Sequence, residues 1–190
     1  QYPAVCNAAE TVLVDSAIAR DFLPQMVERY LKAGVEVRAC PKTIELLEGK
    51  SELKPASEED WRTEYNDLII SIKVVDGINE AIEHINQYGS GHTDAIITEN
   101  KKTALKFMQF VDSSSVMHNA STRFSDGFRY GKGAEVGIST YKVHARGPVG
   151  LEGLVIYKYL LVGKGHTVAS HVGADAKGFT HKRLPKHFFF

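Results

Sequence analysis

Chemistry in this chain could begin at Cys6, which stands in the segment Tyr2-Pro3-Ala4-Val5-Cys6-Asn7-Ala8-Ala9-Glu10-Thr11. A thiol has a pKa of about 8.5, and its thiolate form is the effective nucleophile. Pro3 and the small residues around Cys6 predict a loop at or near the start of a helix, where backbone N–H groups would lower the thiol pKa. The alternative is a buried, inert thiol among alanine and valine side chains, which is the commoner role of a free cysteine.

Two further stretches carry chemically capable side chains. The first is Tyr88-Gly89-Ser90-Gly91-His92-Thr93-Asp94, in which catalytic and structural roles for His92 and Asp94 are equal alternatives. The second is the irregular region 119–150, which contains Asn119-Ala120-Ser121-Thr122-Arg123-Phe124 and His144-Ala145-Arg146-Gly147-Pro148. Irregular stretches of this length inside a compact protein are usually functional or disordered, and the Arg, Asn and aromatic content argues against disorder. Residues 119–150 are therefore predicted to line a site.

The hydrophobic pattern predicts the elements that must position these loops. The expected strands are 11–15, 35–39, 67–75, 94–98, 115–118 and, later, Leu154–Val162, and the expected helices are 17–33, 41–47, 78–88 and 101–111. Strand and helix alternation up to residue 118 predicts an α/β fold, a largely parallel twisted sheet with flanking helices. Ligands of such sheets bind beyond the carboxyl ends of the strands, and we expect the loops 88–94 and 119–150 there.

Composition excludes several classes of protein. The 190 residues include 23 basic and 23 acidic side chains, so no net field attracts nucleic acid or an anionic membrane. No apolar run approaches the roughly 20 residues that span a bilayer, and no signal peptide opens the chain. The two cysteines, Cys6 and Cys40, form no disulfide framework and suit a reducing compartment, although one bridge stays open. No histidine spacing is typical of a metal site, so no catalytic metal is predicted.

Four segments, in order along the chain, resemble the γ-glutamyl phosphate reductase (glutamate-5-semialdehyde dehydrogenase) family of the aldehyde dehydrogenase superfamily. They are Cys6–Thr11, Val75–Ile96, Asn119–Phe124 and His144–Pro148. Tyr2–Ala4 and Gly147–Leu154 look closer to the reductase half of the bifunctional pyrroline-carboxylate synthases. The resemblance implies NADPH-dependent reduction of γ-glutamyl phosphate in proline biosynthesis. Family members place an NADP-binding segment before the cysteine, so we expect this chain to be a fragment that lacks it.

The resemblance also implies a division of the chain and a set of partners. Its parts are a catalytic α/β domain (1–118), site-lining loops (119–150), a segment that passes back into the cofactor domain and contains an oligomerisation strand (151–165), and a tail (166–190). The implied partners are further copies of the intact enzyme and a glutamate kinase, whose fusion or association is left open. The implied location is intracellular, mitochondrial for a bifunctional synthase and cytoplasmic otherwise.

The implied chemistry assigns roles near the start of the chain. The thiolate of Cys6 attacks the γ-carbonyl, expels phosphate and forms a thioester, which hydride from NADPH reduces. The backbone N–H of Cys6 is a candidate oxyanion donor. We interpret Asn7 as a helix cap. Glu64 stands where the superfamily has a glutamate that binds the nicotinamide ribose, and an exposed loop carboxylate is its alternative.

The carboxylate and phosphate of the substrate call for guanidinium or amide donors. Arg123 and Asn119 are the first candidates, with Ser121 and Thr122 beside them. Arg146 is the second candidate, with a role in holding its own loop together as the alternative.

Two other functions stay open. The chain could belong to an aldehyde dehydrogenase for another aldehyde, which would also need a carboxylate base for thioester hydrolysis. It could instead be a non-catalytic assembly module, in which Leu154–Val162 adds a strand to a partner's sheet.

Overall fold

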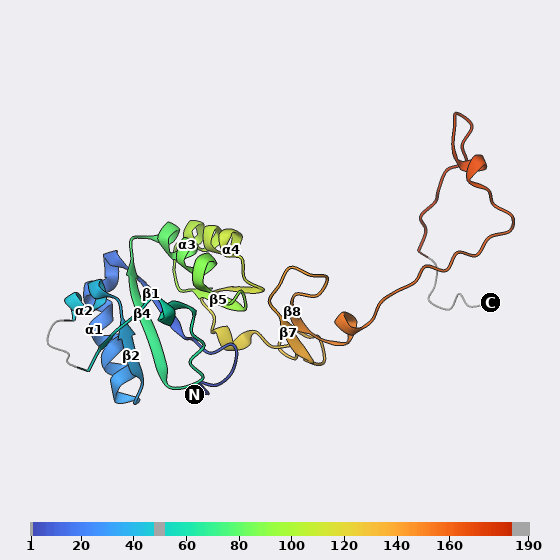
Figure 1. Cartoon of the computed structure of the whole chain (residues 1–190). Coiled ribbons are helices and arrows are strands. Elements are labelled where there is room, and N and C mark those ends of the chain that lie inside the picture. The colour runs from blue at the N-terminus through green and yellow to red at the C-terminus, as the bar shows by residue number, and fades with distance from the viewer. Residues whose placement is uncertain (1, 48–51, 184–190) are drawn as a thin grey trace. The chain divides into compact units, whose positions relative to one another are not determined.

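Four parallel strands form the main sheet of the chain, in the order β1-β4-β2-β3 (Figure 1). The computed structural model describes residues 2–47 and 52–183. The strands are β1 (Thr11–Asp15), β2 (Glu36–Ala39), β3 (Lys54–Pro55) and β4 (Ile69–Val75). The central strand β4 pairs with β1 from Thr11↔Ser71 to Asp15↔Val75, and with β2 on its other side. A central parallel strand is covered on both faces, which explains why β4 is almost uniformly apolar.

Helix α1 (Ser16–Lys32) and the short helix α2 (Pro41–Leu46) pack against this sheet. The carboxylate of Asp15 caps α1 by accepting a hydrogen bond from the backbone N–H of Ala17 at 2.9 Å. Gly34 follows the helix with φ of +75°, a conformation that suits glycine. The core between helix and sheet is fully buried and consists of Val14, Ala19, Leu23, Val27, Val37, Leu47, Ile70, Ile72 and Val74.

A second parallel pair joins β5 (Thr93–Ile96) to β6 (Ser115–His118). Helices α3 (Ile78–Tyr88) and α4 (Lys101–Phe110) pack on each other and enclose a smaller core around Ile82, Phe107 and Val111. Asn100 caps α4, because its side-chain oxygen accepts hydrogen bonds from the first free backbone N–H groups of the helix. β7 (Gly137–Ser139) and β8 (Gly147–Val149) form an antiparallel pair, and 3₁₀ turns cover Glu59–Arg62, Thr122–Phe124, Leu151–Leu154 and Val168–His171.

The α/β fold with a parallel sheet and flanking helices is confirmed, but the predicted C-terminal oligomerisation strand is not seen. The chain forms a 3₁₀ turn at Leu151–Leu154 and then no regular element up to Thr167. Apolar side chains there are exposed, with Ile156 at 96%, Tyr157 at 80% and Leu161 at 93%. The sequence pattern is strand-like, but a strand forms only against a partner strand, and this segment pairs with none of the described strands.

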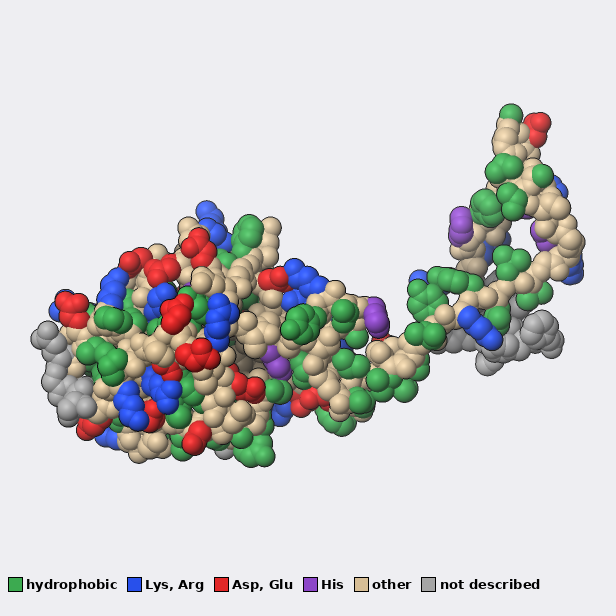
Figure 2. Space-filling view, in the orientation of Figure 1, with side chains coloured by type: hydrophobic (Ala, Val, Ile, Leu, Met, Phe, Trp, Pro, Cys, Tyr) green, Lys and Arg blue, Asp and Glu red, His purple; other side chains and the backbone are tan. Residues whose placement is uncertain are grey.

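The chain divides into two units, Gln1–Val155 and Ile156–Phe190. All the helices and strands that the structure describes belong to the first unit. The second contains the 3₁₀ turn at Val168–His171 and a ring stack between His171 and Phe179, with centroids 5.2 Å apart. On the face of the first unit seen in Figure 2, acidic and basic side chains are interspersed. This agrees with the absence of net charge.

Candidate active site

Cys6 lies on a turn, in which the backbone N–H of Ala8 donates to the carbonyl of Val5 at 2.9 Å. The prediction of a helix start at Cys6 is wrong, because β1 comes next and α1 begins only at Ser16. The side chain is exposed, so the alternative of a buried inert thiol does not apply to it; Cys40 is the buried cysteine. Partial desolvation of the sulfur raises the pKa of the Cys6 thiol, and the carboxylates of Glu135 and Glu64 raise it further.

The imidazole of His92 contacts the Cys6 sulfur, with 3.2 Å between Nε2 and Sγ. Its other ring nitrogen, Nδ1, lies 2.6 Å from the hydroxyl of Thr93. The residue is buried, with 6% of its surface exposed, and this burial lowers its pKa. The ring is therefore predominantly neutral at pH 7. Because the sequence left the role of His92 undecided, its contact with Cys6 is information that only the fold supplies.

Asn7 joins the Cys6 turn to the loop that follows β6. Its amide Nδ2 donates to the carbonyl of Ser125 at 2.9 Å, and its side-chain oxygen accepts from the guanidinium of Arg123. The hydroxyl of Thr122 also donates to the backbone carbonyl of Asn7 at 2.7 Å. The interpretation of Asn7 as a helix cap is wrong, because its polar atoms are used in a tertiary contact across more than a hundred residues of sequence.

Arg123 is thus held beside the Cys6 turn, where its positive charge lowers the pKa of the thiol against the stronger opposing effects. Its Nε atom is buried and has no hydrogen-bond partner among the described residues. A buried guanidinium N–H without a partner is costly, and an anionic group is its natural acceptor. Ser121, whose hydroxyl accepts from the backbone N–H of Arg123 at 3.3 Å, is exposed on the same loop.

Hydrogen bonds between hydroxyl groups fix this loop against the sheet. The hydroxyl of Ser125 lies 3.1 Å from that of Ser115, the first residue of β6, and Tyr130 donates to Ser115 at 2.9 Å. Glu135 is positioned by the backbone N–H of Gly127, which donates to its carboxylate at 2.8 Å. A side chain on Gly127 would clash with the carbonyl oxygen of Ala134, so this close approach requires glycine.

The side chains of Asn119 and Arg146 form their hydrogen bonds with residues other than Cys6. Asn119 has a φ of 51°, and its amide accepts from the backbone N–H of Thr98 at 2.9 Å and donates to the carbonyl of Thr98 at 3.1 Å. The guanidinium of Arg146 binds Asp112, with Nη1 3.1 Å from the carboxylate and Nη2 2.9 Å from the backbone carbonyl. Arg146 also reaches the carbonyl of Thr140 at 3.4 Å, so its side chain connects the segment after α4 with residues 140–146.

Glu64 is exposed on the segment before β4, and its charge acts on both Cys6 and Glu10. Burial raises the pKa of Glu10 to about 7, the charge of Glu64 raises it too, and a hydrogen bond from the backbone N–H of Tyr65 opposes them. The neighbouring Asp60 fixes this segment, because it accepts from Arg38 at 2.5 Å and from the hydroxyl of Tyr65 at 2.9 Å. These contacts hold Glu64 at the edge of the site.

The site lies at the amino ends of the strands. Cys6 precedes β1, Glu64 precedes β4 and His92 immediately precedes β5. The expectation that the loop 88–94 lies beyond the carboxyl ends of the strands is therefore wrong, because His92 in this loop precedes β5. The loop 119–125 leaves the carboxyl end of β6 and doubles back until Ser125 contacts Ser115 at the opposite end of the strand.

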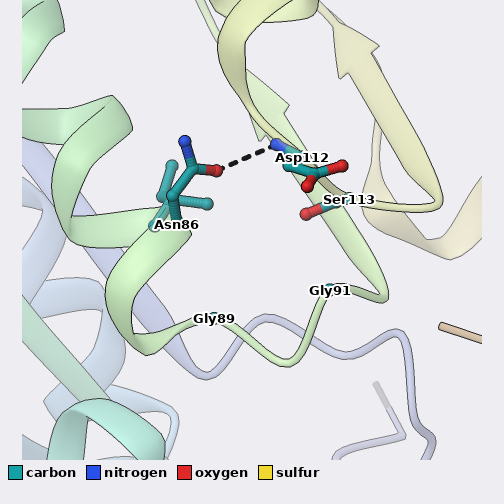
Figure 3. Close-up of a pocket in the computed structure, with 6 residues that line it drawn as sticks. Asn86, Gly89, Gly91, Asp112 and Ser113 are labelled. Atoms are coloured by element: carbon teal, nitrogen blue, oxygen red, sulfur yellow. Dashed lines mark hydrogen bonds between the residues drawn. The ribbon is translucent and has the colours of Figure 1, made fainter. Parts of the chain in front are cut away.

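A separate cavity of about 200 Å³ lies between the end of α3 and the segment after α4 (Figure 3). It is lined by Ile85, Asn86, Gly89, Gly91, Asp112 and Ser113. In Figure 3 the side-chain oxygen of Asn86 points toward Asp112, whose backbone N–H donates to it at 2.9 Å. The sequence indicated only the glycines of this cavity. It contains none of the residues around Cys6.

The described residues, 2–47 and 52–183, hold no group of three or more His, Cys, Asp or Glu side chains placed to bind a metal ion. No helix among them combines the length and the apolar character needed to cross a bilayer.

Comparison with known proteins decides the family. No family model matches the chain. The γ-glutamyl phosphate reductase of Methanococcoides burtonii is 63% identical over 186 residues, which cover 97% of this chain and 41% of that protein. The crystal structure of γ-glutamyl phosphate reductase from Thermotoga maritima superimposes with a TM-score of 0.84 at 53% identity, over 88% of this chain and 40% of that one. The chain belongs to the γ-glutamyl phosphate reductase family.

The chain spans about two fifths of the length of the γ-glutamyl phosphate reductases that it matches, 41% for the M. burtonii protein. An acetylating aldehyde dehydrogenase from Geobacillus thermoglucosidasius shares the fold, with a TM-score of 0.50 at 19% identity over 86% of this chain and 46% of that one. The predicted family is therefore confirmed, and the likeness to the aldehyde dehydrogenase is one of fold. The finer prediction of a bifunctional synthase is not supported, because these relatives are archaeal and bacterial proteins named only as γ-glutamyl phosphate reductase.

Proposed function

We propose that this chain carries the nucleophile of an enzyme that reduces γ-glutamyl phosphate to glutamate-5-semialdehyde with NADPH, in proline biosynthesis. The observation that supports it best is the exposed Cys6 sulfur, 3.2 Å from a neutral imidazole nitrogen of His92 and next to the turn that holds Arg123. The names of the relatives supply the substrate class. Such an acyl phosphate comes from a kinase acting on the γ-carboxylate of glutamate, fused or separate.

In the first step the Cys6 sulfur attacks the γ-carbonyl carbon. The carbon–oxygen bond to phosphate breaks, phosphate leaves with the bonding electrons, and a thioester remains on Cys6. The backbone N–H of Cys6 is the nearest donor for the oxygen that becomes negative. Arg123 supplies a positive charge beside the Cys6 turn for an anionic group of the substrate, with Ser121 and Thr122 on the same turn.

The second step uses a hydride, which NADPH supplies when it is bound. Of the described residues, Glu64 fits this cofactor, because an exposed carboxylate accepts hydrogen bonds from ribose hydroxyls and its charge reaches the Cys6 sulfur. After reduction the bond between carbon and the Cys6 sulfur breaks, which releases the semialdehyde and frees the thiol. We propose that Asn119 and Arg146 hold the loops around the site in place, since the hydrogen bonds of their side chains go to Thr98, Asp112 and Thr140.

Mass spectrometry of the intact chain tests the acyl-transfer step. γ-Glutamyl phosphate is generated in place from glutamate, ATP and a glutamate kinase, and we expect one γ-glutamyl adduct on Cys6 together with one released phosphate. Without the kinase the adduct is absent. If aldehydes and an oxidised nicotinamide acylate Cys6 while the acyl phosphate leaves it unmodified, the chain belongs instead to an enzyme that oxidises another aldehyde.

We also propose that Leu154–Val162 adds a strand to the sheet of a second copy. The proposal is supported by three apolar side chains that are exposed in the single chain and that pairing with another sheet would cover, namely Ile156, Tyr157 and Leu161. Light scattering after size-exclusion chromatography tests this. Ile156→Lys combined with Leu161→Lys should lower the oligomer mass, whereas Val168→Lys, at an exposed position outside the segment, should not. An unchanged mass in the double variant contradicts the proposal.

A further inference from the structure

Cys6 and His92 form a pair in which the imidazole has one nitrogen free to accept a proton. Thr93 contacts Nδ1 at 2.6 Å, and Nε2 lies 3.2 Å from the Cys6 sulfur. A histidine that donates its Nδ1 proton to a hydroxyl oxygen leaves the lone pair of Nε2 facing outward. In this tautomer the distance of 3.2 Å allows the thiol of Cys6 to donate its hydrogen to Nε2.

The ring of His92 is held in place from its backbone. Its carbonyl oxygen accepts from the hydroxyl of Ser114 at 2.6 Å and from the backbone N–H of Ser115 at 3.0 Å, so the residue is fixed to the start of β6. Burial keeps the ring neutral by lowering its pKa, which is the state that a proton acceptor needs. A rigid, neutral base next to the nucleophile is the arrangement that nucleophilic catalysis uses.

The charges around His92 favour its protonated form, the imidazolium that proton transfer from Cys6 would produce. The carboxylates of Glu135, Glu64 and Asp94 face His92 and raise its pKa against the larger effect of burial. On the sulfur side, Glu135 and Glu64 oppose the thiolate, while Arg123 favours it. Because the net effect raises the pKa of the Cys6 thiol, little thiolate exists at neutral pH without help. The cysteine therefore needs a base at the moment of attack.

We propose that His92 is the general base for Cys6, a role that rests on the acyl transfer proposed above. As the sulfur attacks the carbonyl carbon, the S–H bond breaks and its proton passes to Nε2 of His92. The carbon–oxygen bond to phosphate then breaks, and phosphate carries away the electron pair. When the thiolate is released after reduction, the imidazolium returns the proton, so the pair ends as it began. Thr93 is a positioning residue, whose hydroxyl oxygen accepts from Nδ1 in the tautomer that leaves Nε2 free.

The rate of Cys6 acylation across pH tests this, with acetyl phosphate as the probe and quenched samples read by intact mass. We expect His92→Gln to slow acylation at pH 7 by about 10²-fold or more, the usual contribution of a positioned base. The defect should disappear well above the thiol pKa, because solvent then ionises Cys6 without His92. A structural role would give a defect of equal size at every pH. His144→Gln, at an exposed histidine, is the matched control and should follow the wild type.

Three outcomes separate this inference from the proposed function. If wild-type Cys6 is never acylated, by acetyl phosphate or by γ-glutamyl phosphate, the proposed function itself fails. If the wild type is acylated and His92→Gln matches it at pH 7, or lags equally at all pH values, His92 is not the base. Should His92→Gln not fold, the wild type in D₂O decides: slower acylation than in H₂O supports proton transfer at the attack, and equal rates overturn it.

Discussion

The guanidinium of Arg123 donates a hydrogen bond to the side-chain oxygen of Asn7, the residue that directly follows Cys6. Through the same amide, Asn7 also donates to the carbonyl of Ser125 at 2.9 Å. One buried side chain therefore fixes the turn that presents the thiol and the loop that presents the arginine. Residues separated by more than a hundred positions in sequence behave as one unit because of it.

Asn7→Ala tests this connection. The variant removes both hydrogen bonds and leaves the carbonyl of Ser125 and the guanidinium of Arg123 without a partner, so we expect a loss of about 1–3 kcal/mol in the free energy of unfolding. Acylation of Cys6 by acyl phosphate should fall by about tenfold, because Arg123 is no longer held. Asn86→Ala is the matched control: its amide also makes two hydrogen bonds, to Phe110 and Asp112, and acylation should persist. Equal acylation in both variants contradicts the connection.

Cys6→Ser separates chemistry from stability. The side chain is exposed, so the free energy of unfolding should change by less than about 0.5 kcal/mol. Acyl transfer should fall by about 10⁴-fold, because a hydroxyl is a far weaker nucleophile than a thiolate. Cys40→Ala is the counterpart: Cys40 is buried with its sulfur 3.2 Å from the hydroxyl of Thr43, so this variant should lose stability and keep acylation. Activity that survives Cys6→Ser removes Cys6 from the mechanism.

Apart from β3 (Lys54–Pro55), which lies in a stretch that carries no strand pattern, the helices and strands up to residue 118 could be predicted from the sequence because each has a local signal. The apolar spacing of α1, the proline that starts α2 and the apolar run of β4 each identify one element without reference to the rest of the chain. The stretch 154–162 had an equally strong local signal and forms no strand. Pairing is a property of two segments, and sequence patterns describe one at a time.

The site was predicted less completely, for the same reason. The resemblance predicted Cys6 as the nucleophile and Arg123 as a substrate ligand, whereas the contact between His92 and Cys6 depends on how β5 and the first turn meet in space. Asn7 was interpreted by its local capping propensity, and a tertiary contact took precedence. Asn119 has the chemistry of a ligand, and its φ of 51° and its two hydrogen bonds to Thr98, which only the fold supplies, support the structural role proposed for it above.

Glu135→Gln should make Cys6 more reactive in the resting protein. The carboxylate of Glu135 raises the pKa of the thiol, so a neutral amide in its place lowers that pKa and increases the thiolate fraction at pH 7. Alkylation of Cys6 by iodoacetamide, followed by peptide mass spectrometry, should then be faster at pH 7 and unchanged at a pH where the thiol is fully ionised. Glu99→Gln, at an exposed carboxylate outside the site, should leave the rate unaltered. A slower reaction in Glu135→Gln would show that the carboxylate assists ionisation.

Glu10→Gln should stabilise the protein at alkaline pH. Burial and the charge of Glu64 raise the pKa of Glu10 from 4.5 to about 7, so the folded state binds more protons than the unfolded state between these values. Stability from this group is therefore lost as pH rises from about 4.5 to about 7. At pH 8 we expect the free energy of unfolding of Glu10→Gln to exceed that of the wild type by about 1–2 kcal/mol, after allowance for solvent screening. Urea unfolding at pH 5 and pH 8 measures the difference, which should vanish at pH 5 or below.

His84 should make the protein sensitive to mild acid. It is 5% exposed, its ring packs against Trp61 and Tyr88 with centroids 5.3 and 4.6 Å away, and Lys73 lies 3.3 Å from Nδ1. Burial, with the charge of Lys73, lowers its pKa from 6.5 to about 4. The unfolded chain therefore binds the extra proton in this interval, and stability falls as pH decreases from about 6.5 toward 4. We expect a loss of about 2 kcal/mol across that range.

His84→Phe isolates this contribution, because an aromatic ring of similar size keeps the packing on Trp61 and Tyr88 and cannot take a proton. The free energy of unfolding in urea should then decline less between pH 6.5 and pH 4.5 than in the wild type. The carboxylates of Glu80 and Glu58, which face His84 and oppose the shift, remain in both proteins. His144→Gln removes an exposed histidine and should preserve the wild-type decline. If His84→Phe and the wild type lose stability in parallel, the acid sensitivity comes from another group, and the buried ring of His84 is accommodated without a proton-linked cost.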